Sequence, residues 1–364
     1  MNNISDENLA GTLSPVLSRF DWRGECVAAR RWGSGHINDT YRLTVMQGGR
    51  ELHYILQRIN TAIFPDTAAL MGNIRLVTDF VRTAAMNCGS SDVSRSTLTL
   101  IPARSGDVLV RDDKGGCWRC YSFIEGAHTC DVVTSPEQCR EAGRAFGQFQ
   151  YLLRDLPGSR LAETIPDFHN TPKRFQRFLA VLAADKLGRA ASCRPEIDFV
   201  LARQEECATV MKKLANGELP LRVTHNDTKI NNVMLDDATG KGVCVIDLDT
   251  VMPGSVLFDF GDQIRTSTAD AAEDEQDLNK VHFRPQFYQA LLEGYLEQAE
   301  NFLTAEEKRL LPFSGRLLTF ETGLRFLTDY IEGDVYFKIH RDGHNLDRCR
   351  TQFELVRQME ECLR

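Results

Sequence analysis

The sequence predicts a bilobal α+β fold with a β-rich N-terminal lobe and a helix-rich C-terminal lobe. In residues 1–125, short runs of β-forming residues are separated by turns. In residues 126–364, long segments carry apolar side chains at helical spacing. Because 42% of the 364 residues are hydrophobic, the chain can bury a full core. We expect the chain to cross between the lobes at residues 123–126.

The N-terminal lobe is expected to contain a sheet and one or two helices. Gly48 and Gly49 mark a tight turn between two strand-like runs. Residues 68–85 carry apolar side chains spaced four, three and four residues apart, which is typical of a helix. The expected strands span 26–32, 39–45, 51–57, 98–101, 108–111 and 118–124. The first two strands flank a hairpin turn at 33–37.

The C-terminal lobe is expected to consist of helices around one β-hairpin. Ser135 and Pro136 form a helix-start signal before a helix at 136–153. Further helices are expected at 175–191, 197–214, 285–300, 305–330 and 348–363. Apolar runs on both sides of the turn-rich residues 236–242 predict the hairpin.

The charge balance argues against a nucleic acid or an anionic membrane as the main partner. The formal net charge is −8, from 43 basic and 51 acidic residues, and no long basic run occurs. The N-terminus lacks the pattern of a signal peptide, and the longest apolar run is too short to span a bilayer. These features predict a cytoplasmic protein.

The eleven cysteines show no framework spacing, so we expect them to be reduced thiols. Cys117 and Cys120 match the C-x-x-C pattern of metal and redox sites. No second pair and no histidine cluster accompany them. We therefore expect two ordinary positions on a strand.

Three polar residues have the spacing of a phosphoryl-transfer site. Asn232 follows Asp227 by five residues, and Asp247 comes directly after the predicted hairpin. Asp227 can accept or orient the proton of an attacking hydroxyl group. His225 is expected to hold this loop in place and not to act as a base. The pattern predicts a kinase.

The hairpin brings two of these residues together. If Leu235 pairs with Cys244, antiparallel register places Asn232 opposite Asp247. Both side chains can then reach one metal ion. Mg²⁺ prefers oxygen ligands and shares them with substrate phosphates, so an amide oxygen and a carboxylate suit it.

These motifs resemble those of a known superfamily. Residues 225–232 with 246–249 resemble the aminoglycoside phosphotransferase and choline kinase superfamily, whose fold is protein-kinase-like. A closer similarity, to the N-acetylhexosamine 1-kinases, runs from about Gly33 to the C-terminus. The matching segments are 35–38, 63–67, 187–190, 252–255, 257–262 and 311–315.

This resemblance implies a reaction and its partners. ATP would transfer its γ-phosphate to the anomeric hydroxyl of N-acetylglucosamine or N-acetylgalactosamine, giving the sugar 1-phosphate. The implied cofactors are ATP and Mg²⁺, and the partners are a small amino sugar and a nucleotide. A monomer is expected.

The resemblance also assigns residues. Asp227 would be the base, and Asn232 and Asp247 would hold magnesium. Around the nucleotide, Gly35 would lie over the phosphates, Gln57 on the strand below, and the backbone of Ile124 against adenine. For the sugar it points to His36, Asn38, Asp227, Asp249, Thr250, Arg325 and Tyr336.

Several of these residues have a structural alternative. His36 and Asn38 can form a polar hairpin turn, and Asp249 can orient another residue. Arg325 can form a salt bridge with a helix neighbour such as Asp329. Asp259, in one of the matching segments, is expected to brace the lobe and not to touch the substrate.

One departure concerns the nucleotide. Protein kinases hold the α- and β-phosphates with a strand lysine paired to a helix glutamate. Here Gln57 stands at the lysine position, and the following helix offers no obvious glutamate. Either Arg58 or Arg75 supplies the charge, or magnesium and backbone donors do. Strand alternation places Arg58 on the opposite face from Gln57.

Other functions stay open. A kinase for choline would favour an aromatic cage, and one for an aminoglycoside an acidic site, for which the acidic residues 269–277 are a candidate. Homoserine is a further acceptor of this size. A non-catalytic pseudokinase is the alternative from another class, and Gln57 is the feature in its favour.

Overall fold

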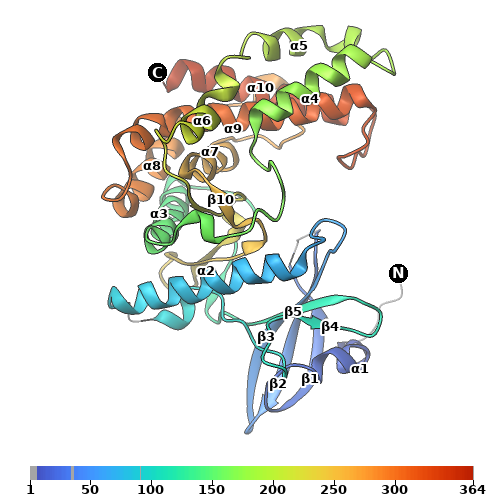
Figure 1. Ribbon diagram of the computed structural model, residues 1–364, viewed down its shortest axis with the longest axis vertical. Helices are drawn as coiled ribbons and strands as arrows, with labels where there is room; N and C mark the ends of the chain where they lie inside the picture. The colour runs from blue at the N-terminus through green and yellow to red at the C-terminus, as the bar shows by residue number, and fades with distance from the viewer. Residues whose placement is uncertain (1–5, 34–36, 91, 364) are drawn as a thin grey trace.

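The computed structural model describes residues 6–33, 37–90 and 92–363 (Figure 1). An antiparallel sheet forms the N-terminal part, and helices dominate the C-terminal part. The predicted bilobal α+β fold is therefore confirmed. The lobe boundary at 125/126 stays a prediction, since one apolar core contains side chains from both sides of it, such as Ile74 and Phe146.

The N-terminal sheet has five strands in the order β1-β2-β3-β5-β4. Helix α1 (Asp6–Leu17) packs on one face, while α2 (Thr67–Asn87) lies between the sheet and the helical lobe (Figure 1). The strands are β1 (Glu25–Arg31), β2 (Asp39–Gln47), β3 (Arg50–Ile59), β4 (Val110–Arg111) and β5 (Cys117–Ser122).

Strand alternation divides β3 between two environments. Tyr54 and Leu56 are buried in the core formed with α1, whereas Ile59 belongs to the core formed with α2. In the ladder with β5, Gln57 pairs with Arg119. This register puts Gln57 and Arg119 on one face and Arg58 on the other.

One strand prediction in this lobe is wrong, and another is too long. Residues 98–101 make only an isolated bridge, between Leu100 and Tyr121. The segment 108–111 contributes just the two residues of β4. Turns on both sides interrupt these segments, so the β-forming residues find no continuous partner strand.

The helical lobe is organised around close helix packing. Gly143 on α3 and Gly294 on α8 let these helices approach, since a Cβ on Gly294 would lie 2.0 Å from the Arg140 carbonyl oxygen. A capping box of Thr304 and Glu307 starts α9. The helices are α3 (Pro136–Leu153), α4 (Thr171–Ala184), α5 (Arg194–Leu201), α6 (Thr209–Ala215), α7 (Val256–Ser267), α8 (Pro285–Ala299), α9 (Ala305–Glu332) and α10 (His344–Cys362).

Three helix predictions differ from the structure. The helix expected at 175–191 ends at Ala184, because Asp185 has a positive φ of 27°. The one expected at 197–214 is two helices, α5 and α6. The sequence reading missed α7, which is buried on nearly all sides, its polar residues Asp259, Asp262 and Gln263 included.

Short strands frame the predicted hairpin. β8 (Val233–Asp236) and β9 (Gly242–Val245) form it, and β6 (Ala127–His128) adds to its edge. β7 (Arg222–Thr224) pairs with β10 (Met252–Gly254). The loop carrying Asp227 therefore leaves one small sheet and enters the other.

The remaining general predictions have these outcomes. Cys117 and Cys120 lie on β5 as expected, three residues apart and so on opposite faces, where they cannot share a metal. All eleven cysteines are free. Across the described residues, no helix combines the length and apolarity that a membrane span requires.

Candidate active site

The loop between β7 and β8 is held by two carboxylates of α7. The backbone N–H groups of His225 and Asn226 donate to Asp259 over 2.9 and 2.7 Å. One turn further along α7, Asp262 accepts from the backbone N–H of Thr228 over 2.8 Å. The loop that carries Asp227 is thereby fixed to a buried helix.

These carboxylates are in different electrostatic states. Burial raises the pKa of Asp259, although hydrogen bonds from the two backbone N–H groups and from Gln150 act against it. Burial also opposes the charge of Asp262, but Arg265, at 2.7 Å, and Lys229 outweigh it and lower the pKa of Asp262. Asp259 braces the lobe, as the sequence predicted.

His225 ties the loop to the hairpin. Its Nδ1 accepts from the backbone N–H of Asp227 at 3.3 Å, and its Nε2 lies 2.9 Å from the carbonyl oxygen of Ile246. The edges of Phe146 and Phe149 enclose the ring. Since its nitrogens both face backbone groups, His225 holds the loop and is not placed as a base.

Asp227 and Asn232 are in direct contact. Asn232 Nδ2 donates to the carbonyl oxygen of Asp227 over 2.8 Å and to its Oδ2 over 3.3 Å. Because the amide nitrogen is used in this way, the Asn232 Oδ1 remains available to a cation. Lys229 Nζ lies 3.0 Å from Asp227 Oδ1. The sequence reading missed Lys229, whose only local signal is its spacing of two from Asp227.

The hairpin register differs by one residue from the expected one. Val233 pairs with Val245 and Met234 with Cys244, and a bulge then brings Leu235 opposite Gly242. Asn232 accordingly receives a backbone hydrogen bond from Ile246 and not from Asp247. The predicted Leu235–Cys244 pairing is wrong, because Cys244 pairs with the preceding residue, Met234.

Asp247 leaves the strand in a left-handed conformation, with φ 57°. Its side chain reaches solvent, but neighbouring protein removes much of its hydration. Together with the charges of Asp249 and Asp227, this raises the pKa of Asp247 to about 6. A divalent cation would relieve this repulsion between carboxylates.

The donor set fits magnesium. Asn232 and Asp247 present an amide and a carboxylate oxygen, which are hard ligands. The described residues contain no group of three or more His, Cys, Asp and Glu arranged to hold a metal. A site with two protein ligands leaves positions for phosphate oxygens and water, which Mg²⁺ usually keeps.

On the N-terminal side, the cation beside Gln57 is Arg119. The Arg119 Nε donates to Gln57 Oε1 over 2.9 Å, and Gln57 Nε2 donates to Thr40 over 3.0 Å. Arg58 lies on the opposite face, as alternation predicted, and Arg75 is 3.8 Å from Asp79. The sequence reading missed Arg119, although a lone arginine within a run of buried strand residues was a signal.

Asp249 receives two N-terminal-lobe donors. One oxygen is paired with Arg119 Nη1, and the other accepts from Asn38 Nδ2 over 2.7 Å. The neighbouring Thr250 hydroxyl donates to the carbonyl oxygen of His225 over 2.6 Å. The structure thus brings Asn38, Asp249 and Thr250 into the protein's own network, and their contact with a sugar stays a prediction.

Arg325 does not form the salt bridge that was its structural alternative. Asp329 instead accepts from the backbone N–H groups of Val335, Tyr336 and Phe337, at 2.8–3.0 Å. The Arg325 guanidinium lies 5.9 Å from the ring centre of Tyr336, whose residue surface is 73% exposed. Among the described residues, Arg325 has no ion-pair partner.

A buried chain of contacts links this region to the catalytic loop. Glu321 lies one turn before Arg325 on α9 and therefore on the same side of that helix. It is 3.0 Å from His169 Nδ1, and His169 Nε2 is 3.2 Å from the carbonyl oxygen of Asn226. Sequence reasoning missed His169 and Glu321, which are 152 residues apart.

The remaining predicted residues have these positions. Ile124 lies between β5 and β6, and among the described residues its backbone N–H and C=O have no hydrogen-bond partner. These groups are free to meet a ligand. Gly35 and His36 lie outside the described residues, so their assigned contacts stay predictions.

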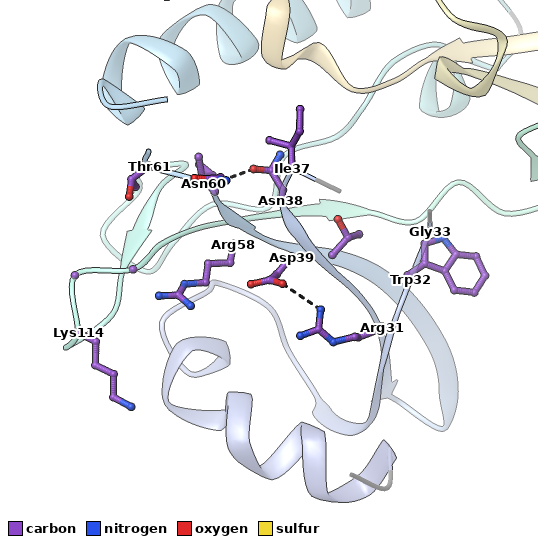
Figure 2. Close-up of a pocket in the computed structure, with 14 residues that line it drawn as sticks. Arg31, Trp32, Gly33, Ile37, Asn38, Asp39, Arg58, Asn60, Thr61 and Lys114 are labelled. Atoms are coloured by element: carbon purple, nitrogen blue, oxygen red, sulfur yellow. Dashed lines mark hydrogen bonds and ion pairs between the residues drawn. The ribbon is translucent and has the colours of Figure 1, made fainter. Parts of the chain in front are cut away.

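A cavity of about 560 Å³ adjoins the site in the N-terminal lobe (Figure 2). Asn38 and Asn60 line one end, where the Asn60 N–H donates to Asn38 Oδ1 over 3.0 Å. Arg31 and Asp39 form an ion pair of 3.1 Å further from the helical lobe. None of the three motif residues lines the cavity, and among the predicted site residues that the structure describes, Asn38 is the one that lines it.

Known structures share this fold. A microcompartment-associated aminopropanol kinase has a TM-score of 0.60 at 16% identity, covering 97% of this chain and 99% of that chain. An aminoglycoside phosphotransferase from Alicyclobacillus acidocaldarius has a TM-score of 0.62 at 14% identity, with 95% and 92% covered. A spectinomycin phosphotransferase in complex with ADP and spectinomycin has a TM-score of 0.53 at 14% identity, with 100% and 99% covered.

The sequence itself identifies the family. Residues 28–307 match the family described as the phosphotransferase enzyme family. This range contains the loop of Asp227 and Asn232, the hairpin and the N-terminal sheet. The chain therefore belongs to the phosphotransferase enzyme family and has its kinase-like fold.

Proposed function

We propose that this phosphotransferase transfers the γ-phosphate of ATP to the anomeric hydroxyl of an N-acetylhexosamine, N-acetylglucosamine or N-acetylgalactosamine. The product is the sugar 1-phosphate. The observation that best supports phosphate transfer is the contact between Asp227 and Asn232. Asp247 is close enough to these residues for the charge of Asp227 to raise its pKa. A base and two oxygen ligands for a cation then face one space.

Asp227 acts on the acceptor. Its Oδ1 and Oδ2 are held by Lys229 and Asn232, so the carboxylate is fixed before any substrate arrives. From this position it orients the hydroxyl and accepts its proton as the bond to phosphorus forms. Lys229 supplies positive charge beside the group that is transferred.

Asn232 and Asp247 would hold the magnesium ion that accompanies ATP. A magnesium ion held by these two residues would supply positive charge against the phosphate oxygens, on which negative charge is spread. The free backbone of Ile124 is the proposed contact for adenine, and Gly35 and Gln57 are proposed near the phosphates. Spectinomycin phosphotransferase has been solved with ADP, which supports a nucleotide at the corresponding part of this fold.

The acceptor side is proposed to include His36, Asn38, Asp249, Thr250, Arg325 and Tyr336. Arg325 supports this assignment because it carries a charge without an ion-pair partner among the described residues. Tyr336 supports it because its ring is exposed although its backbone is anchored by Asp329. A polar acceptor with several oxygens can satisfy such groups.

The structure gives less support to the other acceptors. The acidic segment that favoured an aminoglycoside is already paired with cations. Glu273 lies 3.4 Å from Arg265, and Asp274 lies 3.5 Å from Arg341. The pseudokinase alternative rested on Gln57, and Arg119 places a cation beside that residue.

The test is a scan of acceptors with magnesium and ATP. We expect phosphate transfer to N-acetylglucosamine or N-acetylgalactosamine, with ³¹P NMR showing a sugar 1-phosphate. The 1-O-methyl glycosides are matched controls, since they lack only the anomeric hydroxyl and should not react. Transfer to the methyl glycosides, or no turnover with either amino sugar while nucleotide still binds, would refute the proposal.

A further inference from the structure

We propose that Arg119 is a positioning residue that replaces the strand lysine of related kinases by clamping Asp249. In this way it sets the place of Asp247, two residues earlier, without touching the nucleotide phosphates. The inference rests on the proposed use of magnesium and a nucleotide at this site. It does not depend on the identity of the acceptor.

The first support is burial. Arg119 is 1% exposed and is among the largest fully buried side chains of the described residues. Burial opposes its charge, but Asp249 outweighs this effect and raises the pKa of Arg119. A buried arginine that stays charged needs a partner, and Asp249, itself 4% exposed, is that partner.

The second support is connectivity between the two parts of the chain. Arg119 comes from β5 of the N-terminal sheet, and Asp249 lies 130 residues later, beside the metal-binding candidate. Asn38, directly before β2, donates to the second oxygen of Asp249. Two elements of the sheet therefore hold one carboxylate of the helical lobe.

The third support is the role of Gln57. In the ladder it lies directly opposite Arg119, and its amide oxygen accepts from Arg119 Nε. Its amide nitrogen is engaged by Thr40. A lysine at position 57 would place a second cation against Arg119, whereas the neutral Gln57 accepts a hydrogen bond from it.

The geometry favours positioning over phosphate contact. Arg119 Nε and Nη1 are both engaged, and almost none of the side chain is exposed to a ligand. Other N-terminal cations do not fill the role. Arg58 lies on the opposite face of the sheet, and the Arg75 guanidinium is near Asp79.

The experiment measures ADP affinity by isothermal titration calorimetry, with Mg²⁺ and again with EDTA. For Arg119→Gln we expect the gain in affinity from Mg²⁺ to fall by about 10- to 100-fold, as for residues that orient metal ligands. The metal-free affinity should stay within about threefold of wild type. Asp249→Asn should reproduce this pattern, and the double variant should be no worse than either single one.

Arg58→Gln is the matched control, because it removes the same charge one residue from Gln57 on the opposite face. It should bind ADP like the wild type in both conditions. An equal loss of metal-free affinity in Arg119→Gln would mean that Arg119 contacts the phosphates and would overturn the proposal. An unchanged magnesium effect would overturn it as well.

If Arg119→Gln does not fold, Arg119→Met combined with Asp249→Leu replaces the buried pair with apolar groups, which proteins often tolerate. This double variant should fold and should lack the gain in ADP affinity from Mg²⁺. If the gain were retained, the inference would be wrong. Arg119→Lys should restore part of the effect, because it keeps the charge. If the amino sugars fail as acceptors but these binding results hold, only the acceptor assignment is lost.

Discussion

The catalytic loop and the acceptor rim differ in how many of their polar groups have partners within the protein. In the catalytic loop, residues 225–228, the backbone donors have partners on α7 or on the loop's own histidine. In the proposed acceptor rim, which we define as Arg174, Arg325 and Tyr336, the cations are less fully paired. Arg325 has no ion pair among the described residues, and Arg174 Nε is buried 3.5 Å from Glu321 without making a hydrogen bond.

This difference separates two functions. A base must stand in one place before the substrate arrives, so its loop is bonded in advance. A binding surface must keep polar groups for a ligand, at some cost in stability. Two positive charges lie close together in the rim, as expected for a surface that keeps charged groups for a ligand. Burial and the nearby charge of Arg325 both lower the pKa of Arg174.

The largest effect on this comparison is expected from removing Asp259, which holds the catalytic loop on α7. Asp259→Ala would leave two backbone donors and Gln150 without their acceptor in a fully buried position. At roughly 1–3 kcal/mol for each group, we expect a loss of about 5 kcal/mol in the free energy of unfolding. Urea denaturation measures it. Asp155→Ala, at an exposed aspartate, should change it by less than about 0.5 kcal/mol; equal effects would contradict the bracing role.

The next prediction removes the base but keeps the loop. Asp227→Asn should lower turnover about a thousandfold, because a positioned base contributes on that scale. The fold should be unchanged and sugar binding largely intact, since the amide oxygen of the new asparagine can still accept hydrogen bonds from Asn232 and Lys229. Stopped-flow or coupled assays give kcat, and calorimetry gives the sugar affinity. Near-normal turnover would refute the assigned role of Asp227.

A substitution in the rim should affect binding and not folding. Arg325→Gln is expected to raise KM for the acceptor about 30-fold while the melting temperature stays within about 2 °C, because no ion pair is lost. Arg222→Gln is the contrasting control. Arg222 pairs with the fully buried Glu307, so this variant should lower stability clearly. A large loss of stability in Arg325→Gln would remove the distinction between rim and loop.

The smallest expected effect concerns Glu321, which connects the two regions. Burial opposes its charge, but His169 and Arg174 outweigh burial and lower the pKa of Glu321 below its usual 4.5. Its contribution to stability is therefore complete above pH 4.5 and is lost as the pH falls through the lower folded-state value.

Glu321→Gln should thus cost about 1 kcal/mol at pH 7 and progressively less at more acid pH. Urea denaturation between pH 7 and pH 3.5 follows this difference. Glu300→Gln, at an exposed glutamate, is the matched control and should show no such trend. A difference that grows on acidification would mean that Glu321 has the opposite linkage.

Much of the fold followed from local patterns. The helices α3, α8 and α9 and the strands β2 and β3 have long periodic segments with clear start signals. Their predictions were close for that reason. The predictions failed where tertiary packing decided the outcome: α7 is buried on nearly all sides, and the two strands of the hairpin pair one residue away from the predicted register.

The sequence by itself determined the reaction class. Asp227, Asn232 and Asp247 lie within 21 residues, so their spacing and the hairpin between them were enough. Only the tertiary structure decided what surrounds them. The bracing by α7, the relay through His169 and the clamp of Arg119 on Asp249 join residues far apart in the chain. Such contacts depend on how helices and sheets pack, and no local pattern records them.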